Sequence, residues 1–490
     1  MSTYIIFNTI NFDGVGDYSH FEDIVNALRT NPKFCDVKLI AFVLFHERGK
    51  ESNYLFIGKK LKALDIPFYY GNAEDHERFS LDEEVQKHLR EADQVLVISY
   101  EDCLVSTYKP YIKNNIPFKY IGEHEILLAD PNEIKENGLN RSLGLSAGKQ
   151  GIKICTVPQI ESINSWEIIQ AKDPEFAAKT LTSTNCKDFK QFTHQNVIIP
   201  AYFNLNWDFI EFLRIFAVNK SYPLNKDILI VHSGSNFIDF FDQEKSPYDN
   251  SILLPEKSTY LQKLFKTGFI KQMEIVQPTS DEPFILNFNS DASLVVRIVT
   301  GYRITDPSFV AVYQLAKLAA VTGDNTFERC VSMNVLPFYL STNLKRKLPT
   351  LYSLKKITQD PVLDISEEAR QGYSMFFDPN SIIQNHRDYV FYQHNRAINI
   401  TRFRSLNLPI MIKEWPKVCA YLRSNYNFYN KLEDIIFECI PSQAMPSGFD
   451  LTKKGSTIRD LGFFAQQDTY LYSEERKVEY EDTEISHSNG

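Results

Sequence analysis

The sequence predicts an α/β fold with two domains, each built on a mostly parallel sheet. Apolar, strand-like segments alternate with helical patterns in both halves of the chain, an order that favours parallel sheets. In each half, a polar turn containing glycine also joins an apolar segment to a helical pattern, at residues 13–17 and 323–329. We therefore expect two Rossmann-like domains that face each other across a cleft.

Size and composition narrow the class of protein. The 490 residues are enough for two or three domains, and 43% of them are hydrophobic. The seven cysteines are scattered without zinc-site spacing, which suits a reducing, cytoplasmic location. A net charge of −9 argues against nucleic acid as the main partner. The start of the chain resembles a strand rather than a signal peptide, and no apolar run predicts a transmembrane segment.

The N-terminal half contains the first series of alternating strand and helix patterns. Its helical pattern at residues 20–28 places Phe21, Ile24, Val25 and Leu28 on one face. We assign residues 1–215 to an N-terminal Rossmann-like domain. The expected strands are 4–10, 37–45, 93–99 and 118–121, and the expected helices are 20–28 and 54–64.

Residues 129–200 show less regular patterning. Within them, residues 143–151 are rich in glycine but lack the Gly-Lys-Ser/Thr order of a phosphate loop. This segment is either a phosphate-binding loop or a loop that shapes the substrate pocket, and its spacing favours the second.

A second α/β alternation occupies residues 216–380, which we assign to a C-terminal Rossmann-like domain. Residues 381–445 predict a helical region that packs back on the body, and residues 446–490 a polar, acidic, flexible tail. The expected strands are 227–231, 284–288, 294–299 and 336–340, and the expected helices are 258–265 and 308–318.

Several motifs of catalytic chemistry are missing from the sequence. It has no Asp-x-Asp pair to carry a divalent cation, no Gly-x-Ser-x-Gly elbow and no His-Glu-x-x-His. We therefore expect no metal and no cofactor. A bound diphosphate would depend on backbone N–H groups and hydroxyls, which the start of a helix near Asn325 or Thr326, as capping residues, would supply.

The two junctions carry a resemblance to a known family. Residues 13–17 read Asp-Gly-Val-Gly-Asp, and residues 323–329 read Gly-Asp-Asn-Thr-Phe-Glu-Arg. In this order they resemble the Asp-x-x-Gly-Asp and Gly-Glu-Asp-Ser-Phe-x-Arg motifs of the arginine rhamnosyltransferases that modify elongation factor P. Asn325 departs from that pattern by replacing an acid. The resemblance implies a GT-B glycosyltransferase fold.

The resemblance implies that Asp13 is the general base, with Asp17 holding its loop or assisting it. A carboxylate in a cleft can take a proton from an acceptor nucleophile or orient a guanidinium. His20 is a rival base. Alternatively, both aspartates only cap the helix that follows.

The resemblance also implies that the nucleotide-sugar donor binds mainly to the C-terminal domain and the acceptor mainly to the N-terminal domain. In that reading Asn325 and Thr326 bind the diphosphate, Asp324 contacts a sugar or ribose hydroxyl, and Tyr302 stacks on the base. The competing interpretations are a plain capped helix and a plain loop. The candidate donor-binding residues are Ser233, Gly234, Ser235, Tyr302, Arg303, Gly323, Asp324, Asn325 and Thr326.

Candidate acceptor-binding residues are His124, Asn204 and Asn206. His124 lies between two glutamates, where a histidine is also often only a hydrogen-bonded structural residue. The two asparagines flank Leu205 near the expected domain junction and could line an acceptor groove.

These observations predict a metal-independent hexosyl- or deoxyhexosyltransferase, implied by the resemblance to be inverting. Its partners would be a nucleotide-diphosphate sugar and an acceptor, either a protein side chain or a carbohydrate. The alternatives are a nucleotide-sugar epimerase or hydrolase on the same fold, and a non-catalytic interaction protein. The residue usage and the acidic tail also resemble bacterial effectors delivered into host cells, although a simple disordered terminus explains the tail equally well.

Overall fold

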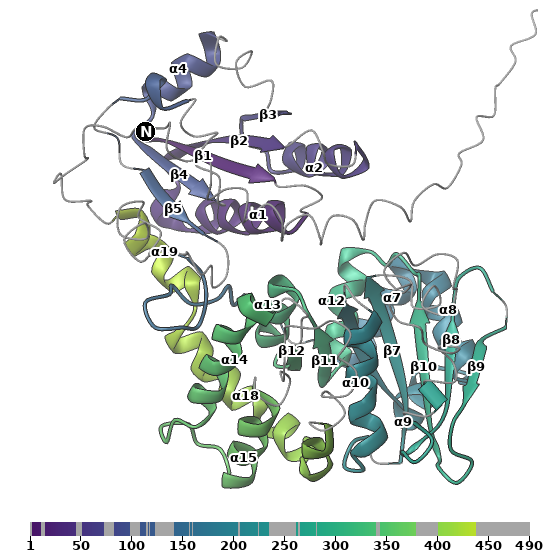
Figure 1. The fold of residues 1–490 in the computed structure, drawn as a ribbon. Coiled ribbons are helices and arrows are strands. Elements are labelled where there is room, and N and C mark those ends of the chain that lie inside the picture. The colour runs from purple at the N-terminus through teal and green to yellow at the C-terminus, as the bar shows by residue number, and fades with distance from the viewer. Residues whose placement is uncertain are drawn as a thin grey trace, which may run out of the picture. The chain divides into compact units, whose positions relative to one another are not determined.

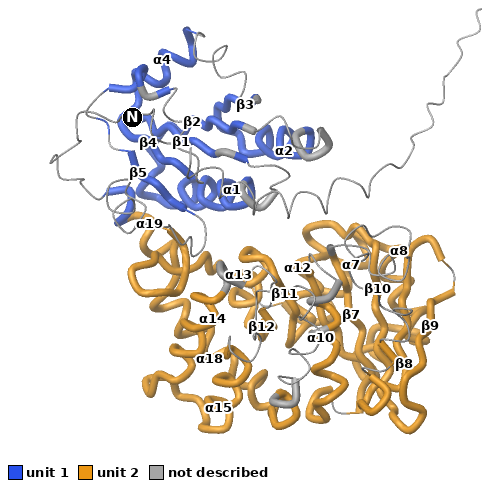
Figure 2. Tube along the Cα trace, in the orientation of Figure 1, with its two compact units in different colours: residues 1–122, 434–490 blue, residues 123–433 orange. Residues whose placement is uncertain are grey.

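The computed structural model divides the chain into two compact units. Unit 1 comprises residues 1–122 and 434–490, and unit 2 comprises residues 123–433 (Figure 2). The structure describes residues 2–10, 15–45, 51–72, 83–98, 108–113, 116, 118–122, 142–155, 157, 158, 160–203, 206–223, 225–234, 261, 262, 265–280, 282–339, 344–378 and 400–437.

Unit 1 is built on a five-stranded, fully parallel sheet in the order β3-β2-β1-β4-β5 (Figure 1). The strands are rich in valine, isoleucine and phenylalanine, and β4 is buried along its whole length, as expected for a sheet covered on both faces. The strands are β1 Ser2–Ile10, β2 Val37–Phe45, β3 Phe68–Asn72, β4 Gln94–Ile98 and β5 Phe118–Ile121, and the helices are α1 Val15–Thr30, η1 Pro32–Phe34, α2 Glu51–Ala63, α4 Glu83–Glu91 and η3 Lys109–Tyr111.

The strand order of unit 1 reverses between β1 and β4. The chain runs outward from β1 through β2 to β3, whereas β4 and β5 extend the sheet on the other side. Because crossovers between parallel strands are right-handed, connections that run in opposite directions lie on opposite faces of the sheet. The carboxyl ends of β1 and β4 therefore form a topological switch point, where ligands of such sheets bind.

Unit 2 contains a seven-stranded sheet in the order β12-β11-β6-β7-β10-β8-β9. Every pairing is parallel except that of the edge strand β9 with β8. The strands are β6 Asn196–Phe203, β7 Asp227–Gly234, β8 Ile270–Val276, β9 Phe284–Asn287, β10 Leu294–Thr300, β11 Leu318–Val321 and β12 Leu336–Tyr339.

The switch point of unit 2 lies between β6 and β11. From β6 the chain moves to β7 on one side, whereas β11 leads to β12 on the other. The two strands end together, because Val321 pairs with Tyr202, and the Thr322 N–H donates to the Tyr202 carbonyl oxygen at 3.1 Å.

Helices pack on both faces of the unit 2 sheet (Figure 1). Side-chain caps fix several of them: Asp188 accepts from the Gln191 N–H, and Ser366 accepts from the Ala369 N–H. The helices are α7 Ser162–Lys172, α8 Pro174–Ser183, α9 Phe189–Gln195, α10 Asn206–Val218, α12 Asp306–Leu315, α13 Asp324–Ser332, α14 Leu344–Thr358, α15 Glu367–Phe376, η7 Ile400–Ser405 and α18 Leu408–Asn425. The last helix, α19 Phe428–Phe437, crosses the boundary, since residues 434–437 belong to unit 1.

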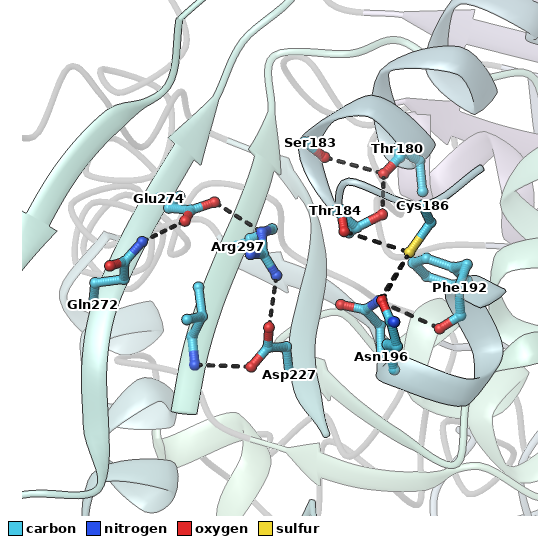
Figure 3. A network of polar contacts seen from close by, with 12 residues as sticks. Thr180, Ser183, Thr184, Cys186, Phe192, Asn196, Asp227, Gln272, Glu274 and Arg297 are labelled. Atoms are coloured by element: carbon cyan, nitrogen blue, oxygen red, sulfur yellow. Dashed lines mark hydrogen bonds and ion pairs between the residues drawn. The ribbon is translucent and has the colours of Figure 1, made fainter. Parts of the chain in front are cut away.

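A polar network occupies the amino-terminal part of the unit 2 sheet, away from the switch point (Figure 3). The Arg297 guanidinium donates to Glu274 at 2.8 Å and to Asp227 at 3.0 Å. Asp227 also accepts the Val295 N–H at 3.1 Å, and Gln272 donates to Glu274 at 2.5 Å. These charged groups are held by one another across β7, β10 and β8, so we assign them a structural role.

The expected α/β class with two Rossmann-like units is confirmed by the two parallel sheets. Unit 2, however, begins at residue 123 rather than 216, because β6 and α10 form the middle of its sheet. Three helices and β6 also lie within residues 129–200, which we expected to be irregular. Pro200 makes β6 look unlike a central strand, since proline removes a ladder hydrogen bond. It is tolerated because β11 pairs only with Ala201 and Tyr202.

Candidate functional site

The carboxyl ends of five strands meet along one edge of unit 2. Thr300 pairs with His232, Ser233 with Tyr202, and Val321 with both Tyr202 and Tyr339. The segments that follow β6, β7, β10, β11 and β12 therefore leave the sheet at the same edge. This edge carries most of the residues that the sequence nominated for a donor.

Helix α13 begins at this edge, directly after β11. Gly323 is its N-cap residue, in an extended conformation, and no side chain caps the helix. The expectation that Asn325 or Thr326 caps it is wrong: both lie in the first turn, and the Thr326 hydroxyl donates to the Gly323 carbonyl at 2.7 Å. Among the described residues, the backbone N–H groups of Asn325 and Thr326 have no acceptor. These N–H groups, at the positive end of the helix dipole, can bind an anion.

Asp324 opens the helix with a negative charge. The Tyr339 hydroxyl, from the end of β12, donates to the Asp324 carboxylate. This contact fixes a half-buried carboxylate beside the first turn. A carboxylate repels phosphate and accepts from hydroxyls, so its chemistry suits a sugar or ribose better.

A buried lysine that the sequence analysis did not select lies beneath the same turn. The Lys153 ammonium donates to Asn325 Oδ1 at 3.0 Å and lies 3.4 Å from the Glu328 carboxylate. The Lys153 and Glu328 side chains are only 3% and 4% exposed, respectively. One signal could have identified Lys153: it is a single cation between Ile152 and Ile154, two fully apolar residues.

The residues at the end of β7 pack closely. The Ser233 hydroxyl donates to the Ala201 carbonyl at 3.3 Å, and Gly234 ends the strand. His232 is buried, lies 3.1 Å from the Thr300 hydroxyl and stacks on Phe209. Burial lowers the pKa of His232 to about 3, so this histidine is neutral at physiological pH.

Tyr302 and Arg303 follow β10 through Gly301, whose φ of 80° suits glycine. Tyr302 is half-buried, and its ring meets Phe176 edge-on at a centroid distance of 5.7 Å. Burial first, and then Glu175, raise the pKa of Tyr302, so its hydroxyl stays protonated. Arg303 is exposed and available to an anionic ligand. A base-stacking role for Tyr302 stays a prediction.

The predicted catalytic residues belong to unit 1. Asp13 lies outside the described residues, in the four-residue connection between the end of β1 and the start of α1 at Val15. Asp17 lies in the first turn of α1, and the structure does not describe its side chain. His20 is 3% exposed on the buried face of α1, next to Phe21, rather than open to solvent. The roles of Asp13 and His20 as bases stay predictions.

One predicted acceptor residue, Asn206, is placed in a different unit from our expectation. Asn206 is the first residue of α10 and belongs to unit 2. It follows the short connection that leaves β6 at the switch point. Asn204 falls in that connection. The described residues do not include Asn204, His124 or Ser235. Asn206 therefore belongs to the unit that carries Gly323, not to the N-terminal sheet.

The described part of the chain has neither a cluster of metal-ligating side chains nor a helix suited to cross a membrane. In the described ranges, no three His, Cys, Asp or Glu side chains are grouped so that they could hold a metal ion. None of the helices described there has the length and apolar character needed to cross a membrane.

No protein-family model and no curated protein matches the chain. Among solved structures, spinosyn rhamnosyltransferase SpnG is similar at 9% identity over 89% of this chain and 99% of its own, with a TM-score of 0.40. The N-terminal domain of Candida albicans trehalose-6-phosphate phosphatase is similar at 10% identity over 89% and 96%, with a TM-score of 0.38. Glycosyltransferase VinC in complex with dTDP is similar at 8% identity over 88% and 98%, with a TM-score of 0.35. Likeness of this degree does not by itself assign an activity to this chain.

Proposed function

We propose that this protein is a glycosyltransferase that moves a sugar from a nucleotide-diphosphate donor to an acceptor without a metal ion. One observation carries the proposal. Each of the two glycine-containing junctions that the sequence singled out directly follows a strand at the topological switch point of its sheet, after β1 in unit 1 and after β11 in unit 2. That is the position where α/β sheets bind their ligands.

In this proposal the donor diphosphate binds at the start of α13. The N–H groups of Asn325 and Thr326, together with the helix dipole, stabilise the negative charge that develops on the diphosphate as it leaves. Asp324 accepts from a hydroxyl of the donor, and Arg303 offsets phosphate charge.

The chemistry is a displacement at the anomeric carbon. Asp13 takes the proton of the acceptor nucleophile while that atom bonds to the anomeric carbon. The bond from this carbon to the diphosphate oxygen breaks, and the oxygen leaves with the electron pair. A direct displacement of this kind inverts the anomeric centre. We propose a protein side chain as the acceptor, with a carbohydrate as the competing class.

The test measures thermal stability with UDP, dTDP, GDP and ADP, each in the presence of EDTA. A bound nucleotide at about 100 times its Kd should add about 2.7 kcal/mol of stability. Stabilisation by one nucleotide that persists with EDTA supports a metal-free donor site. No response to any of the four, with or without Mg²⁺, would contradict the proposal.

A second assay separates the enzyme classes. The nucleotide-sugar of the base that binds is incubated with the protein alone, and free sugar, epimerised sugar and nucleoside diphosphate are measured. Rapid turnover without an acceptor would identify a hydrolase or an epimerase instead. A transferase should show slow loss of donor until an acceptor is added.

A further inference from the structure

Hydrogen bonds hold the segment that carries Lys153 to neighbouring elements of unit 2. The Ile152 N–H donates to the Tyr426 carbonyl at 2.8 Å, and the Phe428 N–H donates back to the Ile152 carbonyl at 2.9 Å. The Lys153 N–H donates to Glu328 Oε1 at 2.8 Å. The backbone of Lys153 is therefore held between α13 and the turn before α19, and its side chain has little freedom.

The contact between Lys153 and Asn325 fixes which way the Asn325 amide faces. An ammonium has three donors and no acceptor, so the amide must turn its oxygen toward Lys153. The measured distance of 3.0 Å joins Lys153 Nζ to Asn325 Oδ1. The NH₂ group is then the end of the amide turned away from Lys153, and among the described residues it has no hydrogen-bond partner.

Glu328 offsets the free-energy cost of burying the Lys153 ammonium. An unpaired ammonium would be costly to bury, and the carboxylate 3.4 Å away compensates its charge. The pair is therefore close to neutral overall, and its effect on a ligand passes mainly through the oriented amide of Asn325.

We propose that Lys153 is a positioning residue for the donor site. It holds Asn325 so that the NH₂ group joins the N–H groups of Asn325 and Thr326 in binding the leaving diphosphate. This inference rests on the proposed function, since it specifies a group of the same site. An aspartate at position 325 would pair with Lys153 and offer no such donor.

The test compares five variants for binding of inorganic pyrophosphate and of the four nucleoside diphosphates by calorimetry in EDTA; the fifth combines Lys153→Met, Glu328→Gln and Asn325→Ala. Lys153→Met alone leaves the Glu328 charge buried, so its folding is at risk. Lys153→Met/Glu328→Gln removes both charges and keeps an acceptor for the backbone N–H at position 153. Asn325→Ala removes the amide. Lys226→Met is the matched control, because Lys226 donates to the Thr193 carbonyl just before β7, at the opposite edge of the sheet.

We expect Lys153→Met/Glu328→Gln to fold normally and to bind the diphosphates about tenfold more weakly, since hydrogen bonds to charged groups are the stronger ones. Asn325→Ala should cost about tenfold in the parent but less than about threefold in the double variant, because the two changes remove one interaction. Lys226→Met should bind like the parent.

Parent-like binding by the folded double variant would overturn the positioning role and leave the proposed function standing. Fully additive losses from the double variant and Asn325→Ala would overturn it as well. If the parent itself binds neither pyrophosphate nor any nucleoside diphosphate, the proposed function fails, and the inference falls with it.

Discussion

The Lys153 ammonium lies 3.4 Å from the Glu328 carboxylate, although the two residues are 175 positions apart in the sequence. Both side chains are almost completely buried, and the carboxylate accepts the Lys153 backbone N–H as well. This ion pair fastens the segment 151–155 to α13 within unit 2.

We expect Lys153→Met to lower the free energy of unfolding of unit 2 by about 3–5 kcal/mol, because it leaves the Glu328 carboxylate buried without its partner. Lys153→Met/Glu328→Gln should recover most of that loss, since no isolated charge remains. Urea denaturation followed by tryptophan fluorescence measures both. Equal losses in the single and double variants would show that the charges themselves do not matter.

Gly151 is expected to resist substitution for two reasons. Its φ is 91°, and an added Cβ would fall on the Tyr426 carbonyl oxygen. Gly151→Ala should therefore cost roughly 2–5 kcal/mol, combining a left-handed backbone with a steric clash. Gly148→Ala is the matched control, since Gly148 has a φ of 80° but nothing within 4 Å of its added Cβ. It should cost about 1–2 kcal/mol. Similar unfolding midpoints for the two variants would contradict the clash.

The buried His232 makes stability depend on pH. Its native pKa is about 3, below the unfolded value of about 6.5, because burial disfavours the charged form. Its contribution is therefore fully present above pH 6.5 and declines as the pH falls toward 3, because the unfolded chain takes up a proton that the native state does not. The loss is about 1.4 kcal/mol per pH unit within that window.

In the His232→Gln variant, the free energy of unfolding should lose the part of its pH dependence that comes from His232. Unfolding free energies measured at pH 7, 6, 5 and 4 for both proteins test it, and the comparison uses slopes rather than absolute stabilities. Parallel curves would show that His232 titrates normally in the native state.

We expect Asp13→Asn to lower kcat by about 10²–10⁴-fold, the contribution of a general base, once an acceptor is known. The donor KM should change by less than about threefold, because donor binding is assigned to unit 2. Asp36→Asn is the control, since Asp36 is an exposed carboxylate just before β2, at the opposite edge of the unit 1 sheet from the end of β1. A variant with parent-like kcat would exclude Asp13 as the base.

Short-range patterns predicted many elements well. The strands expected at 37–45, 93–99 and 118–121 agree with β2, β4 and β5 to within one residue at each end, and the junction at residue 323 does begin a helix. Phe327, an apolar residue of that junction, is fully buried. These features depend on periodicity and turn chemistry within a few residues, which the sequence displays directly.

The sequence by itself determined the two strand–turn–helix junctions and the α/β class. Only the tertiary structure decided that β6 lies between β7 and β11, which moves Asn206 into unit 2, and that Lys153 reaches Asn325 across 172 positions. The physical reason is the range of the forces involved. Helix starts and strand patterns are set by neighbouring residues, whereas strand order and buried ion pairs depend on how distant segments share one core.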